Sequence, residues 1–207
     1  MKKILVTFAA LICLSVISLN YAAETNIFDH PVTAQNTPEL EKVQQMLSVA
    51  DNLKGDFTQT RHIALLSAPL ISSGNFVISK TTGLTWDQLK PFASSLQVTD
   101  TKLIQKMGDN PPTTITKEQQ PIVFSFTSIF LSIFKGDTAK VKQYFNIYFM
   151  GDTVHWEIAL KPNSSPLNKA IASIELSGGE YIQTVSINEV KKNKMVIEFA
   201  NIQPLGK

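Results

Sequence analysis

Two stretches in which apolar and polar residues alternate constrain the fold of this chain more than any other feature. Both lie between Leu53 and Trp86, and we expect a short polar turn to join them. A period of two is typical of strands that bury one face. The sequence therefore predicts an antiparallel pair of strands with one shared apolar face. The positions on that face are Leu53, Gly55, Phe57, Gly74, Phe76 and Ile78.

An amphipathic helix is predicted just before these strands. Thr37 can cap it, Pro38 suits its first turn, and the pattern continues to Asn52. Its apolar stripe consists of Leu40, Val43, Leu47 and Ala50. A one-sided stripe must be buried, so we expect this helix to lie on the sheet. Residues 23–36 are polar and aperiodic, and we expect them to form a loose arm.

A second, much more apolar segment follows Pro121 and ends at Gly136. Its length suits a helix, yet it is too apolar for a solvated one. It is either an ordinary core helix or a helix that plugs a concavity and faces a ligand. Its apolar residues are Ile122, Val123, Phe124, Phe126, Ile129, Phe130, Ile133 and Phe134.

The C-terminal third predicts further strands. We expect a hairpin over Val141–Pro162 that turns at Met150–Asp152 and carries Trp156, Ile158 and Leu160 on one face. A loop at Pro162–Asn168 follows. Three more strands are predicted around Ala170–Leu176, Tyr181–Glu189 and Lys194–Phe199.

The N-terminus has the parts of a secretion signal. Lys2 and Lys3 precede an apolar run over residues 4–19, and small residues follow it. We expect residues 1–23 to be a cleaved signal peptide. Residues 24–207 would then form a single exported domain in the periplasm.

Removal of this signal changes the cysteine and charge content. The cut could fall after Ala22 or after Ala23, and Cys13 lies before both, so we expect a mature chain without thiols or disulfides. Without Lys2 and Lys3, 17 basic residues face 17 acidic ones. No basic run exceeds Lys191-Lys192, which argues against a nucleic-acid partner.

Candidate catalytic groups are scattered. His30, His62 and His155 are far apart, without the spacing of a metal site, and no G-x-S-x-G elbow is present. His155 and Glu157 could form an acid–base pair on one strand face, although residues two apart on a strand are more often a solvated edge. We therefore expect no enzyme activity, no metal and no cofactor.

The order of motifs resembles the periplasmic outer-membrane lipoprotein carrier family, LolA. The motifs are D-F-T-Q-T at Asp56–Thr60, G-x-F at Gly74–Phe76, a basic residue at Lys80 and a tryptophan at Trp86. A predicted strand pair over Ser94–Met107, an apolar helix and further strands come after them. The resemblance thus spans the whole mature chain.

This resemblance implies an α+β fold, in which a strongly curved antiparallel sheet forms an open half-barrel and helices lid its concave apolar face. It implies a monomeric periplasmic carrier that binds the acyl chains of lipoproteins in a hydrophobic cavity and ferries them toward the outer membrane. Its partners would be an inner-membrane donor transporter and an outer-membrane acceptor. The expected lipid-binding residues are Phe57, Phe76, Ile78, Leu84, Trp86, Phe124, Phe126, Ile129 and Phe130.

Lys80 departs from the family pattern. The family typically has an arginine followed by proline at this place, associated with a lid contact, whereas this chain has Lys80-Thr81. A lysine offers a point charge in place of a planar guanidinium fork. We expect Lys80 at the rim of the cavity, either as a lid latch or as a solvated turn residue.

Two other functions stay open. The chain could carry or sense another amphiphile, such as a glycolipid or another free lipid. It could also be an interaction protein whose apolar cup is only a core.

Overall fold

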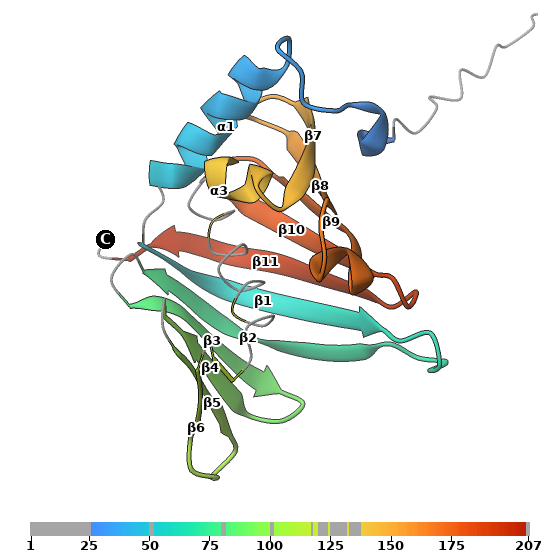
Figure 1. Cartoon of the computed structure of the whole chain (residues 1–207). Helices are drawn as coiled ribbons and strands as arrows, with labels where there is room; N and C mark the ends of the chain where they lie inside the picture. The colour runs from blue at the N-terminus through green and yellow to red at the C-terminus, as the bar shows by residue number, and fades with distance from the viewer. Residues whose placement is uncertain are drawn as a thin grey trace, which may run out of the picture.

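One bent sheet dominates the computed structural model, which describes residues 26–49, 52–79, 82–99, 102–116, 118–119, 124, 132 and 138–205 (Figure 1). The strands are β1 (Asn52–His62), β2 (Leu70–Ser79), β3 (Gly83–Lys90), β4 (Ser94–Val98), β5 (Lys102–Met107), β6 (Thr113–Thr116), β7 (Phe145–Gly151), β8 (Trp156–Pro162), β9 (Ile171–Gly178), β10 (Ile182–Glu189) and β11 (Lys194–Pro204). The helices are η1 (Ile27–Asp29), α1 (Thr37–Val49), α3 (Thr138–Lys142) and η2 (Leu167–Lys169).

The eleven described strands form a single antiparallel sheet in the order β6-β5-β4-β3-β2-β1-β11-β10-β9-β8-β7. Strands that are neighbours in the sheet are also neighbours in the chain, except for β1 and β11, which pair in the middle. That pairing joins an N-terminal half to a C-terminal half. Within the described residues β6 and β7 are the edges, so the sheet is open, and Figure 1 shows them at opposite ends of an arc. The predicted open antiparallel sheet is confirmed.

The alternation that predicted β1 and β2 sets which face is buried. Leu53 lies opposite Ile78, and Phe57 lies opposite Gly74. Leu53, Phe57 and Ile78 are all buried, whereas the intervening Lys54 is exposed. The predicted strand pair over Ser94–Met107 is also present, as β4 and β5. The four-residue strand β6 was not predicted.

Helix α1 is shorter than predicted, because the chain enters β1 at Asn52. Its stripe is buried as expected, with Leu40, Val43 and Leu47 at most 5% exposed. The predicted cap is wrong. The N–H of Leu40 donates to the carbonyl of Asn36, which makes Asn36 the capping position, while the Thr37 hydroxyl donates to the carbonyl of Thr33 at 2.6 Å.

The described part of the predicted loose arm, residues 26–36, is ordered against the edge of β7, so that prediction is wrong for it. Phe149 N–H donates to the carbonyl of His30, and Val32 N–H donates to the carbonyl of Ile147. The Phe28 ring meets the Tyr148 ring edge-on at 5.4 Å. These bonds cover part of an otherwise open strand edge. No apolar spacing marks residues 26–36 in the sequence, which is why they were expected to be loose.

The C-terminal hairpin is present, but three details differ from the prediction. Met150 and Gly151, which were predicted in the turn, belong to β7. Val141 belongs to α3 and is not part of a strand, and His155 lies in the turn before β8. His155 therefore does not share a strand face with Glu157. Trp156, Ile158 and Leu160 are buried on one face, as predicted.

The connection between β1 and β2 also differs from the prediction. It spans residues 63–69 and is apolar at its tip, where Leu65 is 94% exposed and Leu66 is 50% exposed. The predicted Phe-rich helix lies almost wholly outside the described residues. Of it, Phe124 and Ser132 are described, and both are helical and buried. No helix in the described part of the chain is long and apolar enough to cross a membrane.

Candidate functional site

One face of the sheet is apolar across both of its halves. In the N-terminal half, Leu53, Ile78, Leu84, Val98 and Leu103 follow one another directly across five strands. In the C-terminal half, the corresponding row is formed by Ile197, Val185, Leu176, Ile158 and Phe149. All ten side chains are at most 8% exposed. They belong to one hydrophobic cluster, which also includes the α1 stripe.

Four aromatic rings meet where the two halves join. Phe57 stacks on Trp86 with ring centroids 3.7 Å apart, and Phe199 packs edge-on against Phe76 at 5.1 Å and against Trp86 at 6.1 Å. We call Phe57, Phe76, Trp86 and Phe199 the aromatic cluster. Trp86 is half-buried, whereas the other three members of the cluster are at most 8% exposed. Trp86 is therefore the member that other molecules can reach most easily.

Two glycines explain why this cluster can form. A Cβ on Gly55 would lie 2.8 Å from the Phe76 ring and 2.9 Å from the carbonyl oxygen of Ala200. Any side chain on Gly74 would run into the backbone of Asp87 on β3, where the β2–β3 register shifts. The two glycines thus make room for the Phe76 ring and for the close approach of β3.

The structure brings the described members of the predicted lipid-binding set together. Phe57, Phe76, Ile78, Leu84 and Phe124 are buried in the same hydrophobic cluster, and Trp86 packs against it. The remaining predicted residues lie outside the described residues. They are Phe126, Ile129, Phe130 and Lys80.

Sequence reasoning missed Phe199, the fourth aromatic residue of the cluster. Phe199 lies directly opposite Phe57 on the paired strand. The alternation of Met195, Ile197 and Phe199 predicts a half-buried strand, but nothing local reveals that this strand pairs with β1. The separation of the two strands in the chain hid the contact.

One ion pair of the described residues lies near the apolar face, toward one end of the strands. Arg61, on the same face as Phe57, donates from Nη2 to Oε1 of Glu189 at 3.0 Å. Glu189 also accepts from the Asn193 amide at 2.7 Å. These bonds tie the end of β1 to the turn between β10 and β11. They leave the middle of the face to apolar side chains.

Asp56, in the D-F-T-Q-T motif, braces three strands on the opposite face of the sheet. Its two carboxylate oxygens accept from the amides of Asn75 on β2 and Asn201 on β11, each at 2.6 Å. The bond from Asn201, then that from Asn75, holds the pKa of Asp56 below its usual value. Asp56 therefore acts in the fold, as a clamp beside the irregular β1–β11 register.

The histidines are not all far apart in space. His30 and His155 line one pocket of about 430 Å³ together with Glu157. The sequence separation had suggested no such proximity. Within the described residues, no group of three or more histidine, cysteine or acidic side chains could hold a metal ion.

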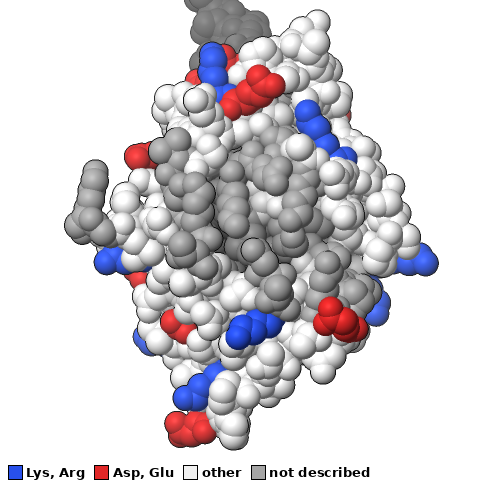
Figure 2. All heavy atoms as spheres, turned by 60° about the vertical axis from the view of Figure 1, so that its left-hand side comes forward, with Lys and Arg blue, Asp and Glu red and all other residues white. Residues whose placement is uncertain are grey.

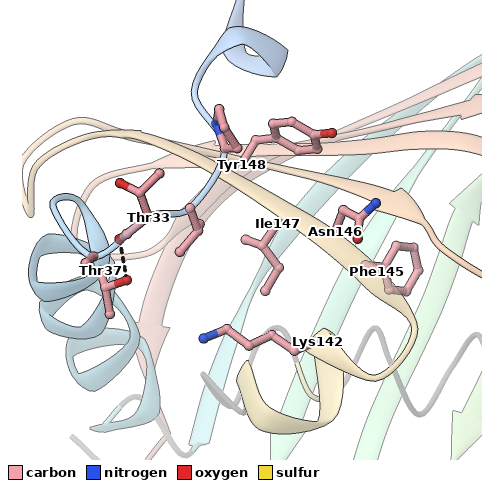
Figure 3. A pocket seen from close by; sticks show the side chains of 10 residues that line it. Thr33, Thr37, Lys142, Phe145, Asn146, Ile147 and Tyr148 are labelled. Atoms are coloured by element: carbon pink, nitrogen blue, oxygen red, sulfur yellow. Dashed lines mark hydrogen bonds between the residues drawn. The ribbon is translucent and has the colours of Figure 1, made fainter.

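A second pocket, of about 620 Å³, lies beside the edge of β7 (Figure 3). Figure 3 shows Ile147 and Lys142 on one side of it and Thr33 and Thr37 on the other. Its lining mixes a lysine, an asparagine and two threonines with apolar groups. None of the predicted lipid-binding residues that the structure describes lines it. On the molecular face shown in Figure 2, the described residues of both charges are scattered and do not form a patch of one sign.

Comparison with known proteins gives one family match in sequence. A family model described as outer membrane lipoprotein carrier protein LolA-like matches residues 32–194. No curated protein matches the chain.

Three solved structures are similar in fold at low identity. A LolA superfamily protein from Nitrosomonas europaea is 10% identical, with 85% of this chain and 95% of that chain covered and a TM-score of 0.46. A DUF1329 family protein from Desulfovibrio piger is 7% identical, with 84% and 94% covered and a TM-score of 0.45. The MucA/MucB complex of Pseudomonas aeruginosa matches at 11% identity, with 79% and 56% covered and a TM-score of 0.38.

Proposed function

The chain belongs to the outer membrane lipoprotein carrier LolA-like family, and we propose that it binds the acyl chains of lipoproteins in the periplasm and carries them toward the outer membrane. The observation that carries this proposal is the apolar face with the aromatic cluster at its centre. The family match predicted from the sequence is confirmed. The cargo and the direction of transport are our proposal.

The physical reason for such a carrier is the cost of exposing acyl chains to water. Each exposed methylene is unfavourable by about 0.8 kcal/mol, so a lipid-modified protein does not cross an aqueous compartment unaided. A wall of phenylalanine, leucine and isoleucine attracts acyl chains without directional bonds. That attraction suits cargo that is recognised by its lipid rather than by its sequence.

The side chains of the described face are buried. Phe57, Phe76 and Leu84 are at most 5% exposed, and Phe124 is buried in the same cluster. Acyl chains can reach this face only if the side chains that cover it give way. We propose that buried side chains packed on this face, Phe124 among them, yield to cargo. The same movement in reverse would return the empty carrier to its closed form.

Half-buried Trp86 offers a place where this exchange begins. Its ring stacks on Phe57 but remains partly open to solvent. An acyl chain that reaches Trp86 finds an apolar surface that continues to Phe76 and Phe199. Trp86 would then contact cargo early and stay in contact with it.

Lys80 remains a prediction from the sequence. If it is a latch, Lys80→Leu should leave cargo uptake intact and slow transfer to an acceptor. The measurement is the transfer rate of a fluorescent lipopeptide to vesicles that contain the acceptor. An unchanged rate would remove Lys80 from the mechanism.

Native mass spectrometry of the protein, purified from the periplasm that produces it, tests the proposed cargo. A co-purified acylated protein would support the lipoprotein carrier. A free lipid would contradict the lipoprotein cargo and support the second function considered above, a carrier or sensor of another amphiphile. Protein that is always free of lipid, and that binds no added lipopeptide, would contradict both.

A further inference from the structure

Large apolar side chains are exposed mainly at one end of the sheet. The hairpins β1–β2, β3–β4, β5–β6 and β10–β11 all turn at this end. Arg61 pairs with both Leu70 and Met195, and Ser94 pairs with Met107. Ser73 near the start of β2 pairs with Lys90 at the end of β3, which places the two groups of hairpins at the same end. We call this end of the sheet the hairpin rim. It consists of the four turns and the two residues on each side of every turn. The turns are residues 63–69, 91–93, 108–112 and 190–193. Figure 1 shows the β1–β2 and β10–β11 turns side by side at this end.

Eight of the eleven exposed large apolar residues in the described chain belong to this rim, so their distribution is strongly one-sided. Leu65 is 94% exposed and Phe92 is 78% exposed, and both lie at the tips of their turns. The other members are Leu66, Leu70, Ile71, Leu89, Met107 and Val190. This gathering of exposed apolar side chains at one end of the sheet, in place of an even scatter over the surface, points to an interaction surface.

Polar bonds hold the leucine-bearing turn outward. Ala64 N–H donates to Oδ1 of Asn193 at 3.0 Å, and the Asn193 amide donates to Glu189, which Arg61 also binds. Leu66 N–H closes the turn by donating to the carbonyl of Ile63. The turn therefore has a fixed base on the neighbouring hairpin. Its leucines project beyond the core.

The charges of the rim are mostly positive. Five lysines, all exposed, lie on its turns and strand ends, namely Lys90, Lys106, Lys191, Lys192 and Lys194. The acidic residues there are Asp109 and Glu189, and Glu189 is already paired with Arg61. The rim therefore has an excess of positive charge, although the mature chain is expected to be neutral overall.

We propose that the hairpin rim docks on the surface of an anionic phospholipid bilayer. Leu65, Leu66 and Phe92 would insert shallowly among the headgroups, and the lysines would meet lipid phosphates. Separate apolar tips on several turns suit a bilayer interface, which accepts many shallow insertions without matching their shape. A protein partner would instead need a complementary surface for each tip. The inference is independent of the proposed cargo, because no residue of the aromatic cluster belongs to the rim.

Flotation with lipid vesicles tests this proposal. The mature protein, without lipopeptide, should float with vesicles that contain phosphatidylglycerol and much less with vesicles of phosphatidylcholine alone. Leu65→Ser combined with Phe92→Ser should weaken binding about tenfold or more, since both side chains lose their apolar contact with lipid. Lys191→Gln combined with Lys192→Gln should weaken it by a similar factor and reduce its salt dependence.

Matched controls come from the other end of the sheet. Val154→Ser removes a 63% exposed apolar residue, and Lys54→Gln combined with Lys102→Gln removes two exposed lysines. These controls should bind vesicles like the unmodified protein. All variants should keep their melting temperature, because the altered side chains are exposed.

Three results would overturn the inference. They are absence of vesicle binding by the unmodified protein, equal losses in rim and control variants, and a dimer in solution that Leu65→Ser dissociates. The last would assign the rim to a second copy of the chain. Lipopeptide binding by the rim variants, measured in parallel, should be unchanged. Failure of the cargo proposal would therefore be seen separately from failure of membrane docking.

Discussion

Truncation of Phe57 should be among the most destabilising single changes in the apolar face. Phe57 is 2% exposed, stacks on Trp86 at 3.7 Å and lies opposite both Gly74 and Phe199. Phe57→Ala leaves a cavity between three strands, which should lower the free energy of unfolding by about 3–5 kcal/mol. For a domain of this length, the melting temperature should fall by roughly 6–20 °C.

Phe57→Leu distinguishes the stabilisation that comes from the aromatic ring from that which comes from the buried volume. Leucine keeps most of the buried volume but loses the stacking on Trp86, so we expect a loss of about 1 kcal/mol. The difference in the free energy of unfolding between Phe57→Ala and Phe57→Leu measures the energetic cost of the cavity. Leu65→Ala, at the 94% exposed position, is the control and should change stability by less than about 0.5 kcal/mol.

Urea unfolding followed by circular dichroism and by tryptophan fluorescence provides the measurement. The chain has two tryptophans, Trp86 in the aromatic cluster and Trp156 buried on β8. Unfolding seen by both signals at one midpoint would justify a two-state free energy. A loss below about 1 kcal/mol for Phe57→Ala, or equal losses for the two Phe57 variants, would refute the assignment of Phe57 to the packed centre of the sheet.

Three further predictions follow from the same geometry. Trp86→Ala should destabilise the empty protein less than Phe57→Ala does, because Trp86 is half-buried. The same variant should bind acyl chains about tenfold more weakly, as measured by calorimetric titration. Unchanged affinity would exclude Trp86 from the site. Gly55→Ala should lower the free energy of unfolding by about 1–3 kcal/mol, since the added Cβ would meet the Phe76 ring and the Ala200 carbonyl. In a double-mutant cycle, Phe76→Leu should relieve part of that loss. Asp56→Asn should remove one contribution to acid lability. The lowered pKa of Asp56 in the fold stabilises the protein above the unfolded pKa near 3.8, and this stabilisation is lost as the pH falls through the folded pKa. Melting temperatures should therefore fall less steeply from pH 5 to pH 3 in the variant, and identical slopes would contradict the role of the clamp.

Local periodicity was sufficient to predict most of the strands, and the resemblance to the LolA family implied the open antiparallel sheet. The alternation around Phe57 and Phe76 reports which side chains share a face, because successive side chains on a strand point to opposite sides. The helix stripe of Leu40, Val43 and Leu47 was likewise visible. The strand members of the predicted lipid-binding set, such as Phe57 and Trp86, then lie together because β1, β2 and β3 are neighbours both along the chain and in the sheet.

Features that depend on distant contacts could not be predicted in this way. The pairing of β1 with β11 places Phe199 beside Phe57, although about 140 residues separate them. The order of residues 26–36 comes from backbone hydrogen bonds to β7. Such bonds depend little on side chains, so no pattern in the sequence indicated them. The leucine-bearing turn was expected to be polar because turns usually are, and its exposed leucines only became evident with the fold.

Contact quenching of Trp86 shows whether acyl chains occupy the face around the aromatic cluster. A lipopeptide with brominated acyl chains quenches tryptophan fluorescence on contact. Trp86 and Trp156 differ in access, because Trp156 is 1% exposed, bonded through Nε1 to the carbonyl of Gly179, and six positions away in the strand order. Trp86→Phe keeps a ring in the cluster and leaves Trp156 as the only reporter.

Saturation with the brominated lipopeptide should quench the Trp86 part of the emission and leave Trp156 unaffected. In Trp86→Phe, binding measured by calorimetry should persist while the quenching disappears. Binding without quenching of Trp86 in the unmodified protein, or equal quenching in Trp86→Phe, would place the acyl chains elsewhere and contradict the account.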